Sequence, residues 1–251
     1  MMNILNRNAV FCSPLPRSFS AKVIAHAFML LAILITSNMA ACGAVNSPPM
    51  AKDETEVRKV FEAFRSAVVT KNTSAAAALV SKAGFKHAAH IQELALYAPR
   101  EVLEAEPISA EMYVLMLRMS FTAQQLKTMQ PAEVLAFGVE KGFIGNLWQA
   151  DDQLQGFRFL SSDMGKGQRI RHQTPVGAPV QLAREGFQTW RVDILPELAM
   201  LDKNMRSLAK ARNLSERTVA RAVVEFQSMK PLQPRYFDPL FPPKTAQLGG
   251  A

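Results

Sequence analysis

The chain has 251 residues, a net charge of +8 and two cysteines, Cys12 and Cys42. So few cysteines exclude a disulfide framework and a thiolate metal site. The length suits one domain with appendages.

The N-terminus has the composition of an export signal. Residues 1–22 carry three basic residues and no acidic one, and a 14-residue apolar run follows from Val23 to Thr36. This order, with small residues after the run, is typical of a secretory signal peptide. The run is shorter than the about 20 apolar residues of a membrane-spanning helix. Extension to Ala44 would reach that length, so an uncleaved anchor is the alternative.

The segment Met39-Ala40-Ala41-Cys42-Gly43 lies just after this run. It resembles the lipobox of bacterial lipoproteins, in which an aliphatic residue and two small residues precede an invariant cysteine. Met39 replaces the preferred leucine. The resemblance implies cleavage between Ala41 and Cys42, so that Cys42 becomes the new N-terminus. The alternative is an ordinary signal peptide with an incidental cysteine.

In that family the cysteine thiol carries a diacylglycerol thioether and a further acyl chain, often palmitate, is added. Several acyl chains give stable membrane anchoring where one is marginal. Gly43 stands where inner-membrane lipoproteins usually have Asp. The resemblance therefore implies a cell-envelope protein anchored at the outer membrane and facing the periplasm.

Cleavage would leave 26 basic and 21 acidic residues, with Cys42 as the remaining cysteine. This mild basic excess suits an anionic membrane or a cell-wall surface. It is weaker than the concentrated basic footprint of a nucleic-acid-binding protein. We therefore expect the membrane as a partner, together with an envelope protein or a cell-wall component, and no nucleic acid.

The sequence predicts four segments. With the cleavage that the lipobox resemblance implies, residues 1–41 are the signal peptide, and residues 42–52 are the lipidated cysteine and a tether containing two adjacent prolines. Residues 53–229 form a single α+β domain. Residues 230–251 are a Pro-rich tail, part of which can dock on the domain through Phe237, Leu240 and Phe241.

The first half of the domain has helical periodicity. Helices are expected over Asp53–Val68, Thr73–Ser81, Lys86–Tyr97, Glu111–Met119 and Pro131–Gly142, with a capping box at Thr122–Gln125. Gly84 is expected to end the second helix. The fourth helix is apolar on most sides, which predicts a position inside the domain.

The pattern then alternates with period two, which predicts half-buried antiparallel strands. The strands are expected at Phe157–Phe159, Ile170–His172, Val180–Leu182 and Trp190–Ile194, and Leu147–Trp148 could begin one more. Met164–Gly167 and Glu185–Gly186 are the expected turns. Helical spacing returns over Leu195–Leu208 and over Ser215–Phe226. The predicted fold class is α+β: helices, an antiparallel sheet of about four strands, cone-like or open, then two helices.

Helices followed by a meander that ends in Trp190-Arg191-Val192-Asp193 resemble the cone-shaped fold of the nuclear-transport-factor-2-like superfamily. The opening helix 57–64 and the Ala-rich segment 75–80 are similar to the start of many such domains. The resemblance covers Asp53–Ile194. The long helical middle and the two final helices depart from that family, so the alternative is an unclassified α+β domain with helices packed on an antiparallel sheet.

Alternation places His172 on the apolar sheet face, so this face is the candidate pocket. Its expected lining residues are Phe157, Phe159, Ile170, His172 and Trp190. In the cone fold this face lines a cavity in which enzymes carry acid–base groups. His172 is thus the candidate acid–base residue, against the alternative of a histidine buried in the core. Arg158, Arg169, Arg171 and Arg191 are expected on the opposite face, either solvated or covered by acidic residues of the C-terminal helices. The alternative is that this face meets lipid headgroups, cell-wall carboxylates or an acidic partner.

Two further motifs have competing interpretations. His87 and His90 lie one helical turn apart, a spacing that can share a metal, with Glu93 and His172 as further ligands. Two surface histidines are the simpler interpretation, and we predict no metal and no cofactor. Residues 214–221 resemble the start of a recognition helix, but a Ser cap followed by Arg and Val is common helix chemistry.

The sequence thus predicts an envelope lipoprotein anchored through Cys42, with a ligand- or protein-binding domain and no evident catalysis. The alternative is an enzyme of isomerase or dehydratase type that uses a pocket around His172.

Overall fold

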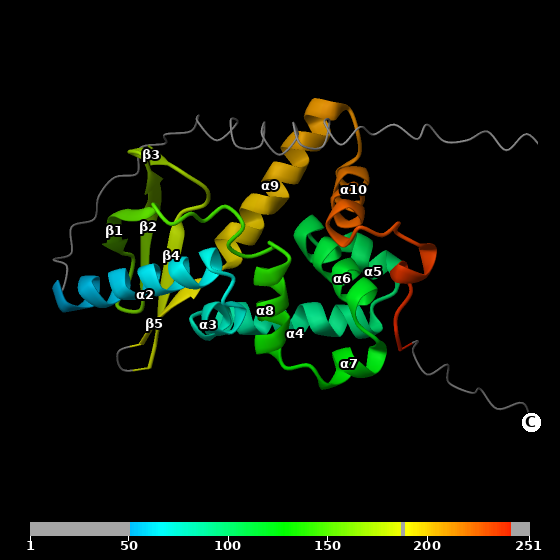
Figure 1. Cartoon of the computed structure of the whole chain (residues 1–251), viewed down its shortest axis with the longest axis horizontal. Coiled ribbons are helices and arrows are strands. Elements are labelled where there is room, and N and C mark those ends of the chain that lie inside the picture. The colour runs from blue at the N-terminus through cyan, green and yellow to red at the C-terminus, as the bar shows by residue number, and fades with distance from the viewer. Residues whose placement is uncertain (1–50, 187–188, 242–251) are drawn as a thin grey trace, which may run out of the picture. The chain divides into compact units, whose positions relative to one another are not determined.

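The computed structural model describes residues 51–186 and 189–241 (Figure 1). The segment that resembles a lipobox, the basic and apolar segments before it, and residues 242–251 lie outside these ranges. No helix within the described ranges is long and apolar enough to cross a membrane.

Seven helices form the first half of the described chain. They are α2 (Ala51–Val69), α3 (Thr73–Ala78), α4 (Lys82–Tyr97), α5 (Arg100–Ala105), α6 (Ile108–Ser120), α7 (Ala123–Thr128) and α8 (Pro131–Glu140). The five predicted helices are present, and the capping box of Thr122 with Gln125 is confirmed. The short α5 was not predicted.

Gly84 does not end the second helix, contrary to the prediction. α3 ends at Ala78, and Gly84 lies in the first turn of α4, where the hydroxyl of Ser81 accepts a hydrogen bond from its N–H at 3.3 Å. A Cβ at this position would collide with Val80. Gly84 is therefore needed for close packing and not for a break in the helix.

The sheet follows, with strands β1 (Gln153–Phe159), β2 (Met164–Arg171), β3 (Thr174–Pro175), β4 (Val180–Glu185) and β5 (Thr189–Asp193). Its order is β1-β2-β4-β5, all pairings are antiparallel, and β3 pairs with β2. The predicted fold class is confirmed, and of its two sheet forms the open one is present. The sheet does not close into a cone.

Two local predictions in the sheet were wrong. Met164–Gly167 belong to β2, and the connection from β1 runs through residues 160–163. Trp148 lies in the segment between α8 and β1, where its ring packs against Phe61 and Phe64 of α2. The turn at Glu185–Gly186 is in its predicted place, and Gly186 has φ +66°.

The C-terminal helices are α9 (Leu195–Arg212) and α10 (Glu216–Ser228), followed by a short 3-10 helix, η1 (Pro234–Phe237). α10 packs against α6 and α9 (Figure 1). The predicted Ser215 cap is confirmed, because its Oγ accepts a hydrogen bond from the Thr218 N–H. The predicted docking of the tail is also confirmed: Phe237 is buried, and the Phe241 N–H donates to the Leu96 carbonyl at 2.9 Å.

One hydrophobic core joins the helices to the sheet. α6 is buried from Ile108 to Met119, as its apolar sequence predicted. α2 lies across one face of the sheet and contacts β1 and β5 (Figure 1). At the sheet edge, Val80 pairs with Val192, so the helical half and the sheet share backbone hydrogen bonds.

Candidate functional site

On β2, the residues that face the core differ from those that the sequence predicted. Gly165, Gly167 and Arg169 face the core, whereas Ile170 is only partly buried and alternates with them. The prediction that Ile170 lines the apolar face is therefore wrong. The phenyl ring of Phe157 occupies the space that a Cβ on Gly165 would need. A strand whose inward residues are two glycines and one arginine shows no apolar alternation.

The aromatic part of the predicted pocket is assembled as expected. The Trp190 ring centroid lies 5.8 Å from that of Phe159 and 6.5 Å from that of Phe157. A register shift between Gln155 and Arg158, where Gly156 has φ +61°, brings Leu154 and Phe157 to the same face, over Gly167. Trp190 is 1% exposed, so these rings pack together as core.

His172 does not lie on the apolar face, contrary to the prediction. The chain leaves β2 after Arg171, and His172 has φ +47° in the connection to β3. Its side chain is 85% exposed, and its Nε2 lies 3.0 Å from the Asp151 carboxylate. The residue on which the enzyme alternative depended is thus a surface residue outside any apolar pocket.

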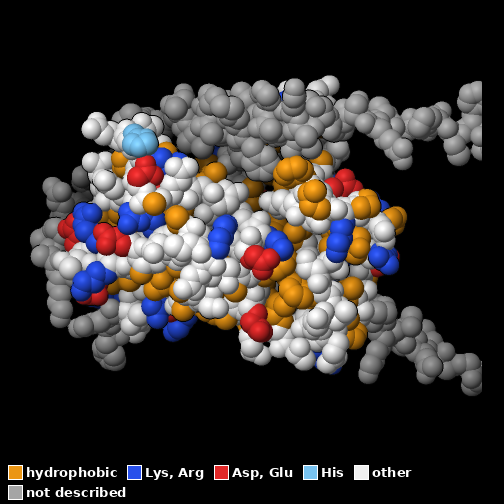
Figure 2. Space-filling view, viewed as in Figure 1, with side chains coloured by type: hydrophobic (Ala, Val, Ile, Leu, Met, Phe, Trp, Pro, Cys, Tyr) orange, Lys and Arg blue, Asp and Glu red, His pale blue; other side chains and the backbone are white. Residues whose placement is uncertain are grey.

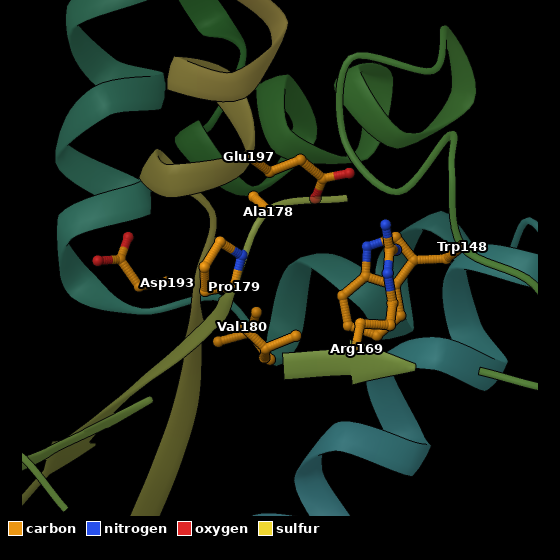
Figure 3. A pocket seen from close by; sticks show the side chains of 8 residues that line it. Trp148, Arg169, Ala178, Pro179, Val180, Asp193 and Glu197 are labelled. Atoms are coloured by element: carbon orange, nitrogen blue, oxygen red, sulfur yellow. The ribbon is translucent and has the colours of Figure 1, made fainter. Parts of the chain in front are cut away.

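A small cavity lies instead at the end of the sheet, beside the start of α9 (Figure 3). It is lined by Trp148, Arg169, Ala178, Pro179, Val180, Val192, Asp193 and Glu197. The centre of a water molecule has about 20 Å³ of space in it. This is room for about one water molecule, whereas pockets for small-molecule ligands are far larger.

Arg169 is the central polar residue of this cavity. It is 2% exposed, and its guanidinium lies 4.7 Å from the centre of the Trp148 ring. Its Nε lies 3.5 Å from the Asp152 carboxylate, and its Nη1 has no hydrogen-bond partner among the described residues. Burial lowers the pKa of Arg169, while the charges of Glu197 and Asp152 oppose this effect. Gly177 leaves the space that this guanidinium fills.

Two carboxylates border the cavity on different sides. Glu197 extends toward Trp148 and Arg169, whereas Asp193 points away from them (Figure 3). Glu197 accepts a hydrogen bond from the Gly145 N–H at 3.1 Å. Desolvation raises the pKa of Glu197, opposed by the charge of Arg169 and by hydrogen bonds from Gly145 and Trp148. Desolvation likewise raises the pKa of Asp193.

Asp152 binds Arg169 and Arg171 of β2 on the sheet face that the rest of the domain covers. It is fully buried and accepts a hydrogen bond from the Arg171 Nε at 2.8 Å. Of the two surroundings predicted for the four arginines, a solvated face is therefore wrong for Arg169 and Arg171. The sequence did not reveal the contact of Asp152 with Arg169 and Arg171, because the acid and the arginines are separated along the chain. The pair Asp151-Asp152 just before β1 was the one local hint of a buried charge.

The histidine pair on α4 is not part of a larger group of metal ligands among the described residues. His87 is half-buried, and His90 Nε2 lies 3.4 Å from the Glu106 carboxylate. Across the described residues, no group of three or more His, Cys, Asp or Glu side chains could hold a metal ion. Burial and the neighbouring His90 lower the pKa of His87.

Residues 214–221, which resemble the start of a recognition helix, include the cap and first turns of α10 and hold this helix on the domain. Arg217 and Arg221 of α10 bind the buried carboxylate of Glu111 on α6, and Arg221 also lies 2.9 Å from Glu104. These arginines therefore attach α10 to the rest of the domain, where a DNA-reading helix would need them free.

Comparison of the chain with protein-family models, curated proteins and solved structures finds no match. The fold class is thus established by the structure itself, and a family is not.

Proposed function

We propose that the chain is an envelope lipoprotein, held at a membrane by acyl chains on Cys42. The observation that supports this most directly is the segment Met39–Gly43, directly after a basic region and a 14-residue apolar run. A diacylglycerol thioether with a further acyl chain would anchor the protein stably. Gly43 in place of Asp favours the outer membrane, with the domain facing the periplasm.

The position of the first described helix is compatible with this anchor. Eight residues separate Cys42 from α2, which begins at Ala51. At about 3.3–3.6 Å per extended residue, this tether reaches about 30 Å. The domain would therefore stay close to the bilayer and act there as a binding module for an envelope or cell-wall partner.

The experiment compares Cys42→Ser with Cys12→Ser in cells fed a labelled fatty acid. Cys42→Ser should abolish incorporation of the label, because a serine hydroxyl cannot form the thioether. The variant should also leave the membrane fraction and appear in the soluble fraction. Cys12→Ser is the matched control, since Cys12 lies in the segment that cleavage removes. Unchanged labelling and partition of Cys42→Ser would reject the proposal.

A further inference from the structure

The exposed side of α9 carries three basic residues in one row. Lys203, Arg206 and Lys210 are spaced three and four residues apart, so they lie in one stripe along the helix, and all three are exposed. We call these three residues the α9 basic stripe. The core side of the same helix carries Leu198, Met205 and Ala209, which are buried. The orientation of the stripe toward the surface is therefore set by packing.

The stripe lacks acidic partners among the described residues, unlike basic residues such as Arg58, Lys59 and Arg100 that form ion pairs on other helices. None of its side chains forms an ion pair or a side-chain hydrogen bond with another described residue. The acidic residue nearest in sequence is Asp202, and its carboxylate accepts a hydrogen bond from the Ser109 N–H at 2.6 Å. The other acid of α9, Glu197, lines the cavity. Arg212, exposed in the last turn, adds further positive charge.

The charges of α2 make the contrast clear. There, Arg58 pairs with Glu54 at 2.7 Å and Lys59 with Glu56 at 2.9 Å. Acidic and basic side chains are interspersed over this helix (Figure 2). Paired surface charges largely neutralise each other's field, whereas three unpaired cations within about two turns attract an anionic surface.

We propose that the α9 basic stripe binds the anionic headgroups of phospholipids in the bilayer that holds the Cys42 acyl chains. This inference rests on the proposed lipid anchor, because a tether of eight residues keeps the domain within reach of headgroups. Near an anionic membrane surface, three cations strengthen contact about 100-fold. The anchor keeps the protein at the membrane, and the stripe orients the domain on it.

The test uses the full acylated protein, purified in detergent and reconstituted into vesicles. The vesicles contain either phosphatidylcholine alone or phosphatidylcholine with about one quarter phosphatidylglycerol. Lysines are then acetylated with a water-soluble reagent and quantified by mass spectrometry. Labelling of Lys203 and Lys210 should fall several-fold on the anionic vesicles and recover in 0.5 M salt, because salt screens the attraction. Lys86, exposed on α4, is the internal reference.

Two triple variants distinguish an effect of the α9 basic stripe itself from an effect of the protein's net charge. Lys203→Gln/Arg206→Gln/Lys210→Gln removes the stripe, and Lys82→Gln/Lys86→Gln/Lys230→Gln removes the same charge from exposed positions elsewhere. The readout for both is the protection of the α9 backbone from hydrogen exchange on anionic vesicles. Only the first triple variant should lose this protection.

The outcomes distinguish this inference from the proposed function. An N-terminal fragment without acyl mass at Cys42 would reject the lipid anchor. A normal acyl mass, with Lys203 and Lys210 labelled equally on both kinds of vesicle, would reject the lipid-binding stripe alone. Equal labelling on both vesicles combined with protection by added double-stranded DNA would also overturn it, in favour of a nucleic-acid partner.

Discussion

The carboxylate of Glu111 on α6 lies 3.0 Å from the guanidinium of Arg221 on α10, and Arg217 binds its other oxygen. Glu111 is fully buried, whereas the two arginine side chains are 25–29% exposed. The negative charge is thus enclosed by the domain, and the positive charges reach it from the surface. This cluster fixes the last long helix onto the most deeply buried one.

Glu111→Gln should therefore destabilise the domain. Removing one member of a buried ion pair commonly costs about 3–5 kcal/mol, and partial exposure of the arginines lowers our expectation to about 2–4 kcal/mol. Urea unfolding measures the change. Glu56→Gln, which removes an exposed partner of Lys59, is the control and should change stability by less than about 1 kcal/mol. Similar losses in both variants would show that the cluster contributes no more than a surface pair.

The contact between Gly138 and Tyr113 predicts an intolerance to one methyl group. A Cβ on Gly138 would collide with the Tyr113 hydroxyl, which is buried and donates to the Val134 carbonyl. Gly138→Ala should lower the free energy of unfolding by about 1–3 kcal/mol, although alanine favours helix more than glycine does. Adding Tyr113→Phe removes the colliding oxygen, so the double variant should lose less than the sum of the single losses. Strict additivity in a double-mutant cycle would contradict this explanation.

Glu197 predicts a specific pH dependence of stability. Its pKa is raised in the folded state, so the folded protein binds more protons than the unfolded chain between the two pKa values. Stability from this group is therefore present below the unfolded value, about 4.3, and is lost as pH rises through the folded pKa. Glu197→Gln should gain stability relative to wild type as pH rises from about 4 to 8. Urea unfolding across this range measures the difference, with Glu93→Gln, at an exposed position, as the baseline. A difference that stays constant with pH would refute the prediction.

The contacts of Arg118 predict that one substitution would both destabilise the domain and loosen the C-terminal segment around Tyr236. Its buried guanidinium donates to the carbonyls of Leu94, Ala95 and Ala98 at the end of α4, and to that of Tyr236 at 3.2 Å. Desolvation lowers the pKa of Arg118 to about 10, so it remains charged at neutral pH.

Arg118→Met should therefore cost about 2–4 kcal/mol, because several buried carbonyls lose a charged donor. It should also speed tryptic cleavage after Arg235, since the segment loses an attachment. Arg118→Lys keeps one charged donor group and should have a smaller effect on both measurements. An unchanged cleavage rate in Arg118→Met would contradict the link.

The helices and the strand order could be predicted from the sequence because their signals are local. Caps at Thr122 and Ser215 and the apolar run of α6 each depend on a few neighbouring residues. The face of β2 could not be predicted. Its inward positions are Gly165, Gly167 and Arg169, so the usual apolar signal is replaced by space for Phe157 and by a buried charge.

The cavity was equally inaccessible to sequence reasoning. Trp148, Arg169 and Glu197 come from a loop, a strand and a helix, and no spacing rule joins them. His172 shows a related error, because the predicted alternation placed Ile170 on the apolar face and His172 with it, whereas the inward residue of the neighbouring positions 169 and 170 is Arg169. The strand ends at Arg171, where pairing with Thr174 of β3 closes a tight connection.

The bond from Arg118 to the Tyr236 carbonyl spans 118 residues of chain. During synthesis, this bond can form only after residue 236 has left the ribosome. Closing so long a loop is slow compared with forming local helices. In a nascent chain, Arg118 would thus bind the carbonyls of α4 before it gains its bond to the C-terminal segment.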